Sequence, residues 1–127
     1  MKLNFLTIFI IATILILSGG VFFFSKNQSV DGGSLPAPTS YEYYWSKTCP
    51  HCAKVQEFMD TWEGRDKIQM EKYEINESKE NQQRFLQRGK DCKIPRSQMG
   101  VPLLLTPKGV CLSGDEPIIQ HFKDLGI

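Results

Sequence analysis

Neither sign of charge dominates the chain, because 15 lysines and arginines stand against 14 aspartates and glutamates among 127 residues. This balance gives no support for a nucleic-acid partner, since domains that bind nucleic acids usually carry a basic excess. Four cysteines are too few for a small fold held together mainly by disulfides. A hydrophobic fraction of 41% excludes a disordered chain, and the length allows one small domain with an appendage.

The appendage is the amino-terminal stretch of residues 3–24, which carries no charged side chain. About 20 apolar residues suffice to cross a hydrocarbon layer ~30 Å thick, so the stretch predicts a transmembrane helix. A cleaved signal peptide is the alternative, but its apolar part is usually only about 7–15 residues long. Here the apolar run resumes at residues 21–24 after the small residues at 18–20, which favours a retained anchor. No cysteine follows the run closely, so a lipoprotein anchor is not indicated.

The flanking charges predict the orientation of this anchor and the compartment of the domain. Lys2 and the amino terminus precede the apolar run, and the positive-inside tendency keeps that end in the cytoplasm. We therefore expect residues 1–24 to be a single-pass anchor in the cytoplasmic membrane, with the rest of the chain outside the cytoplasm. Residues 25–39 are rich in Gly, Ser and Pro and predict a flexible linker. The folded domain is expected over residues 40–127.

Hydrophobic patterning in this domain predicts alternating strands and helices. Strands are expected at residues 41–45, 68–75, 101–106 and 110–112, and helices at 50–63, 78–89 and 115–126, where Asp115 can cap the last helix. The order is β-α-β-α-β-β-α. A strand–helix–strand opening implies a parallel pair, and the late hairpin adds two antiparallel strands. We expect an α/β fold with a four-stranded mixed sheet and flanking helices, preceded by one transmembrane helix.

The sequence Cys-Pro-His-Cys begins the first predicted helix of the domain. Pro50 suits the first helical position, which places Cys49 at the N-cap. There, unpaired backbone N–H groups and the positive end of the helix dipole favour a thiolate, the species that attacks disulfides. Cys52 lies on the apolar face of the helix and should be shielded. The predicted roles are attack by Cys49 and resolution by Cys52, with His51 tuning the pair through a charge or a hydrogen bond.

Two cysteines at this spacing can also bind a metal ion or form a structural disulfide. Zinc would need a second ligand pair at short spacing, which Cys92 and Cys111 do not form. A purely structural disulfide between Cys49 and Cys52 would close a very small loop and contribute little stability. The main alternative function is a copper(I)-binding or metal-delivery module that uses both thiols and a methionine. Our prediction contains no resident metal and no cofactor.

Cys92 and Cys111 pose a separate question. In an oxidising compartment two remaining cysteines often pair, and a disulfide across this gap would stabilise the fold by about 3 kcal/mol. The alternative is two independent thiols, with Cys111 buried as a small apolar side chain. The sequence alone favours neither arrangement.

Three features together resemble the thioredoxin-like superfamily. They are the aromatic strand at residues 41–45, the dithiol motif at 49–52 and the Met-Gly-Val-Pro at 99–102 before a strand-turn-strand. Over about residues 40–127 the pattern is most similar to compact, glutaredoxin-like members. The Pro-His dipeptide between the cysteines resembles that of periplasmic disulfide-bond oxidases.

The resemblance implies both a site and an activity. It implies a cis bond between Val101 and Pro102, with the Val101 backbone binding an extended substrate and Pro102 packing near the dithiol. It implies a thiol–disulfide oxidoreductase that acts on cysteine-containing proteins, with a membrane redox partner that recharges it. Gly114 and Asp115 resemble the place where glutaredoxins hold glutathione, although a helix cap also explains Asp115. The direction of electron flow stays open between oxidase, isomerase and reductase.

Overall fold

The computed structural model describes residues 4, 7–8, 10–11, 13–14 and 33–127. The chain divides into two units, Met1–Gly33 and Ser34–Ile127. In the part that is described, no helix is both long enough and apolar enough to cross a membrane. Most of the anchor predicted at residues 3–24 lies outside the described residues, and so does most of the predicted linker.

The second unit has the element order that the patterning predicts. Within the described residues it contains strands β1 (Tyr41–Trp45), β2 (Met70–Glu74), β3 (Leu103–Leu105) and β4 (Cys111–Ser113), helices α2 (Pro50–Thr61), α3 (Lys79–Asp91) and α4 (Asp115–Asp124), and the 3-10 helices η2 (Glu63–Lys67) and η3 (Arg96–Gln98). The strands lie in the order β2-β1-β3-β4. The β1–β2 pair is parallel, and the β1–β3 and β3–β4 pairs are antiparallel. The α/β fold with a four-stranded mixed sheet is confirmed.

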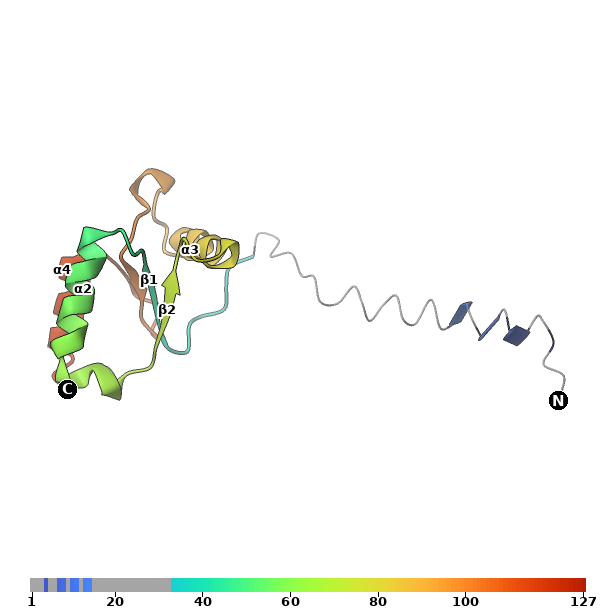
Figure 1. Ribbon diagram of the computed structural model, residues 1–127, viewed down its shortest axis with the longest axis horizontal. Coiled ribbons are helices and arrows are strands. Elements are labelled where there is room, and N and C mark those ends of the chain that lie inside the picture. The colour runs from blue at the N-terminus through green and yellow to red at the C-terminus, as the bar shows by residue number, and fades with distance from the viewer. Residues whose placement is uncertain (1–3, 5–6, 9, 12, 15–32) are drawn as a thin grey trace. The chain divides into compact units, whose positions relative to one another are not determined.

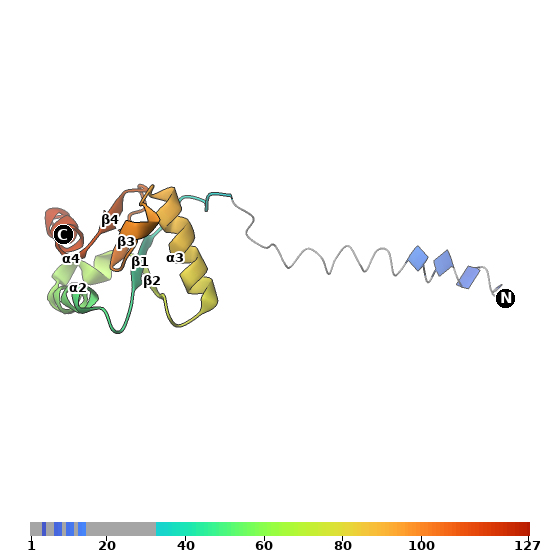
Figure 2. The same ribbon diagram turned by 90° about the horizontal axis from the view of Figure 1, so that it is seen from above.

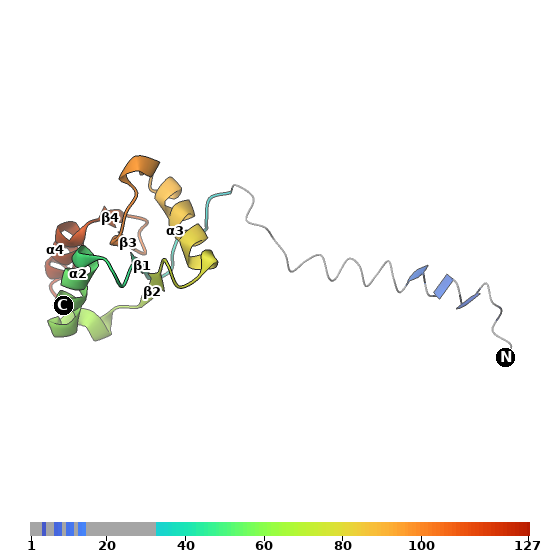
Figure 3. The same ribbon diagram turned by 45° about the horizontal axis from the view of Figure 1, so that its top comes forward.

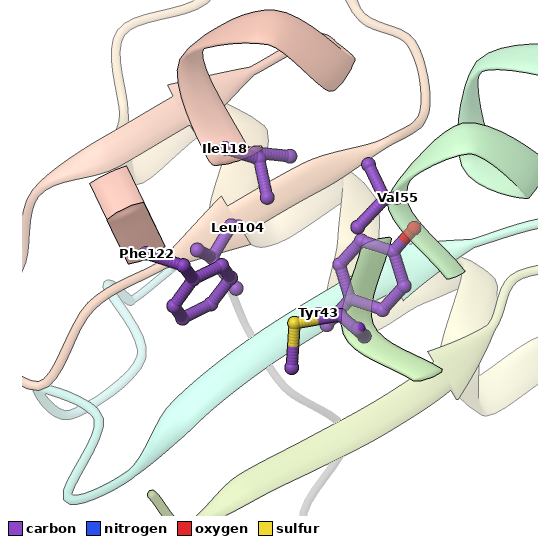
Figure 4. Packing of buried hydrophobic residues seen from close by; sticks show 6 residues of the cluster. Tyr43, Val55, Leu104, Ile118 and Phe122 are labelled. Carbon is purple, nitrogen blue, oxygen red and sulfur yellow. The ribbon is translucent and has the colours of Figure 1, made fainter. Parts of the chain in front are cut away.

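Helices cover both faces of this sheet. Figures 1, 2 and 3 show α2 and α4 together on one face and α3 on the other. Successive strand residues point to opposite faces, so Tyr43 packs toward α2 and α4 while Tyr44 packs toward α3. The first core cluster contains Tyr43, Val55, Met59, Leu104, Ile118 and Phe122 (Figure 4), and the second contains Tyr44, Phe85, Leu103 and Leu105.

Several predicted boundaries differ from the structure, most by one to three residues. Helix α2 ends at Thr61, so Gly64 is not its stop but lies buried within η2. A Cβ atom on Gly64 would lie 2.3 Å from Cζ2 of Trp62, so the close approach of this ring requires a glycine. The strand predicted at 68–75 contracts to Met70–Glu74, and the one at 101–106 contracts to Leu103–Leu105.

A buried ion-pair network fixes α3 on the sheet. The Glu42 side chain of β1 is only 3% exposed, and Arg88 donates to both of its carboxylate oxygens at 2.7 and 2.9 Å. Arg84 and Tyr44 donate to the same carboxylate at 2.7 and 2.8 Å. Burial alone would raise the pKa of Glu42, but these hydrogen bonds hold it below its ordinary value. The charged network therefore joins β1 to α3 as an ion pair at neutral pH.

The two cysteines outside the motif are joined to each other. Cys92 follows α3 and Cys111 begins β4, and their sulfur atoms form a disulfide with a Cα–Cα distance of 5.9 Å. The bond ties the end of α3 to the edge strand of the sheet. Of the two arrangements that the sequence left open, the structure has the pair.

Candidate active site

Cys49 lies at the end of the loop that connects strand β1 to helix α2. The chain leaves β1 at Trp45, and Cys49 becomes the N-cap of α2, with Pro50 as the first helical residue. The backbone N–H of Cys52 donates to Cys49 Sγ at 3.2 Å. This is the capping arrangement that the sequence predicts. A backbone N–H and the positive end of the helix dipole therefore both act on the Cys49 sulfur.

The two thiols differ sharply in their environment. Both are free, but Cys49 is half-buried whereas Cys52 is only 3% exposed. Cys52 shares the buried face of α2 with Val55 and Met59, as the helical spacing predicts. Burial raises the pKa of the Cys52 thiol to about 12, so Cys52 stays protonated at neutral pH. Because of this difference, Cys49 can be reached by a group from another molecule, whereas Cys52 is shielded from such a group.

The loop before Cys49 is held by a buried carboxylate that sequence reasoning missed. Glu74, at the end of β2, is 5% exposed and accepts the backbone N–H groups of Lys47 at 3.3 Å and Asn76 at 2.9 Å. The Asn76 amide donates to the Ser46 hydroxyl at 2.9 Å. One signal was present in the sequence, because the carboxyl ends of parallel strands meet at one edge of the sheet. Glu74 therefore positions the loop that delivers Cys49.

The segment before β3 reaches the dithiol from the opposite side. The Val101–Pro102 peptide bond is cis, and Pro102 is fully buried. The Cys49 thiol donates to the Val101 carbonyl oxygen at 3.5 Å. The structure thus places the Val101 carbonyl at Cys49 Sγ and makes the bond to Pro102 cis, as the family resemblance implies.

His51 is held by α4. Its Nδ1 atom lies 2.9 Å from Oδ1 of Asp115, and the Lys54 ammonium lies 3.2 Å from the other carboxylate oxygen. Burial would raise the pKa of Asp115, but hydrogen bonds from Lys54 and His51 hold it below its ordinary value. The prediction that Asp115 caps the last helix is wrong. The N-cap residue of α4 is Gly114, with φ +93°, and no side chain makes a capping hydrogen bond at this end of the helix. Asp115 instead ties the tip of α2 to the start of α4.

Metal ligands are scarce in the described part of the chain. No group of three or more His, Cys, Asp or Glu side chains is arranged there to hold a metal ion. Cys49 and Cys52 would supply two sulfur ligands. Met59, which the copper alternative could have used, lies in the core and is 7% exposed.

A strand–helix junction that carries a half-buried thiol and a fully buried one, near a cis proline, defines a thiol oxidoreductase of the thioredoxin-like class. The glutaredoxin family model matches residues 41–105, just over half of the chain, and the protein belongs to the glutaredoxin family. No curated protein and no solved structure shows a significant match to the chain.

Proposed function

We propose that this protein is a membrane-tethered thiol–disulfide oxidoreductase that acts on cysteine-containing proteins outside the cytoplasm. The observation that carries the proposal is the arrangement of the two thiols on α2. Cys49 is half-buried and caps the N-terminus of α2, where its sulfur accepts the Cys52 N–H, while Cys52 is buried one turn further along. This geometry supports attack by the first sulfur and resolution by the second.

The exchange proceeds through a mixed disulfide. The Cys49 thiolate attacks one sulfur of a substrate disulfide, a new S–S bond forms, and the other substrate sulfur leaves as a thiolate that takes up a proton. Cys52 then loses its proton to solvent and attacks Cys49 Sγ. The Cys49–Cys52 disulfide forms and the substrate sulfur departs, so the substrate gains two electrons and the dithiol loses two. The same steps in reverse oxidise a substrate dithiol.

Two observations support the proposed compartment. The uncharged stretch at residues 3–24 is long enough to anchor the chain in a bilayer. The Cys92–Cys111 disulfide is of a kind that persists in oxidising compartments and is rare in the cytosol. A single-pass anchor in the cytoplasmic membrane would hold the domain near a membrane redox partner that recharges the dithiol.

The direction of electron flow depends on the reduction potential of the Cys49–Cys52 pair. The Pro50-His51 dipeptide favours oxidation or isomerisation of substrates, by its resemblance to disulfide-bond oxidases. Equilibration of the domain against glutathione buffers measures this potential directly. A mildly negative value would support an oxidase or isomerase, and a strongly negative value would support a reductase.

Cysteine variants test the proposed roles. We expect Cys49→Ser to abolish turnover of a disulfide-bonded protein substrate. Cys52→Ser should accumulate mixed disulfides that non-reducing electrophoresis resolves, because the resolving thiol is missing. The variant with both Cys92 and Cys111 changed to Ser is the matched control and should neither lose turnover nor trap substrate. Turnover by Cys49→Ser, or no trapped species with Cys52→Ser, would contradict these roles.

A further inference from the structure

The Tyr43 hydroxyl is a buried polar group that the reaction above does not use. Tyr43 is 3% exposed and lies in the core between β1, α2 and α4. Its hydroxyl oxygen has no hydrogen-bond partner among the described residues. Buried polar groups are nearly always bonded, so a hydroxyl without a hydrogen bond draws attention to the polar groups nearest to it.

The surroundings of this hydroxyl point to the dithiol. In Figure 4 the ring of Tyr43 directs its oxygen toward the part of the cluster where Val55 of α2 lies, away from Phe122. Val55 is one helical turn from Cys52, on the same buried face of α2. Burial, and next the Cys52 and Cys49 thiols, raise the pKa of Tyr43 far above its ordinary value. The hydroxyl therefore keeps its proton and can act as a donor.

The chemistry develops negative charge on Cys52, where such a donor would act. When Cys52 attacks the mixed disulfide, it must first become a thiolate in a place where burial disfavours a charge. In the reverse direction Cys52 leaves as a thiolate when a substrate thiolate attacks Cys49. In either case negative charge develops on a sulfur that is almost completely buried. A protonated hydroxyl already in place would stabilise that charge without reorganisation.

We propose that the Tyr43 hydroxyl donates a hydrogen bond to the Cys52 thiolate during resolution of the mixed disulfide. The inference rests on the proposed oxidoreductase function and adds a donor to the second half of the exchange. It assigns no part to Tyr43 in the attack by Cys49. Hydrogen bonds to charged groups are strong enough that their loss corresponds to about a ten- to hundredfold change in rate.

Tyr43→Phe tests the proposal, because it removes only the hydroxyl and leaves the ring in the core. The protein with a reduced Cys49–Cys52 pair and an intact Cys92–Cys111 disulfide is mixed with one equivalent of 5,5′-dithiobis(2-nitrobenzoate) per protein. The first release of thionitrobenzoate reports attack by Cys49, and the second reports resolution by Cys52. We expect an unchanged first phase and a second phase slowed about tenfold or more.

Tyr44→Phe is the matched control. Tyr44 is a buried tyrosine on the same strand, but its hydroxyl bonds to Glu42 at 2.8 Å, on the α3 side of the sheet. It should leave the ratio of the two phases unchanged. Since both phases come from one sample, the first phase also shows whether Tyr43→Phe retains a folded site.

Three other results of this experiment would overturn either the role of Tyr43 or the proposed function. A second phase in Tyr43→Phe within twofold of the wild type would overturn the role of Tyr43. Equal slowing of both phases would also overturn it, because it would show a general loss of packing. A wild-type protein that releases only one equivalent, and never forms the Cys49–Cys52 disulfide, would overturn the proposed function and the inference with it.

Discussion

Loss of the Cys92–Cys111 disulfide should weaken the fold strongly and leave the chemistry intact. The two cysteines are separated by 19 positions in the sequence. In the chain-entropy model, a disulfide that closes a loop of this length stabilises the folded state by about 3 kcal/mol. At about 4–8 °C per kcal/mol for a domain of this size, the double Cys→Ser variant should unfold about 12–24 °C lower than the wild type.

Thermal and urea unfolding followed by circular dichroism would measure this change. The matched comparison is the wild type under reducing conditions, which should unfold close to the variant. The rate of disulfide exchange should stay near that of the wild type below the lower midpoint. The reason is that Cys111 pairs with Leu105, whereas the dithiol contacts the chain before the opposite end of β3.

Two results would refute this reasoning. One is a variant that unfolds within about 3 °C of the wild type, because the entropy argument predicts a fall several times larger. The other is a native wild-type protein with four alkylatable thiols by mass spectrometry, where the structure leaves only Cys49 and Cys52 free. The second result would show that the pair does not form, and the first that it does not stabilise the fold.

Two further predictions concern charged groups. Glu42→Gln should destabilise the fold by about 3–5 kcal/mol in urea unfolding, because it leaves Arg88 buried without a full counter-charge. The pKa of Glu42 is lowered in the folded state, so the contribution of its carboxylate to stability is present at neutral pH and is lost as the pH falls through the folded pKa. If the free energies of unfolding of the wild type and Glu42→Gln changed in parallel with pH below pH 5, this reasoning would be contradicted. Asp115→Asn should speed alkylation of Cys49 at pH 7 severalfold, because the positive charge near the tip of α2 then lacks its anionic partner. An unchanged alkylation rate in a Cys52→Ser background would show that this carboxylate does not act on the thiol.

The parts of the site that the sequence predicts are those set by local geometry. Cys49 as N-cap and Pro50 as the first helical residue follow from helix-terminus chemistry within a few residues. The burial of Cys52 follows from the 3.6-residue period of the same helix. The placement of Val101 and Pro102 came from the family resemblance, since a proline before a strand has no distinctive local pattern.

The parts that the sequence did not predict depend on contacts between distant elements. Glu42 and Arg88 belong to a strand and a helix whose packing is known only once the sheet order is known. Glu74 holds the loop before Cys49 only because β2 is parallel to β1. The sequence pattern predicts Tyr43 only as an aromatic residue of the core. That its hydroxyl lacks a hydrogen bond is known only from the positions of the surrounding described residues.

Asp115 shows how such distant contacts decide the chemistry of the tip. By resemblance this carboxylate stands where glutaredoxins hold glutathione, but here it already bonds His51 and Lys54 of α2. An ammonium group of an incoming ligand would have to displace a cation that the same chain supplies at high effective concentration. A protein substrate that binds through the Val101 backbone needs no such exchange. On the function proposed above, we therefore expect the dithiol to reduce a protein disulfide faster than glutathione disulfide, and Lys54→Ala, which frees one carboxylate oxygen of Asp115, should narrow the difference between these two rates.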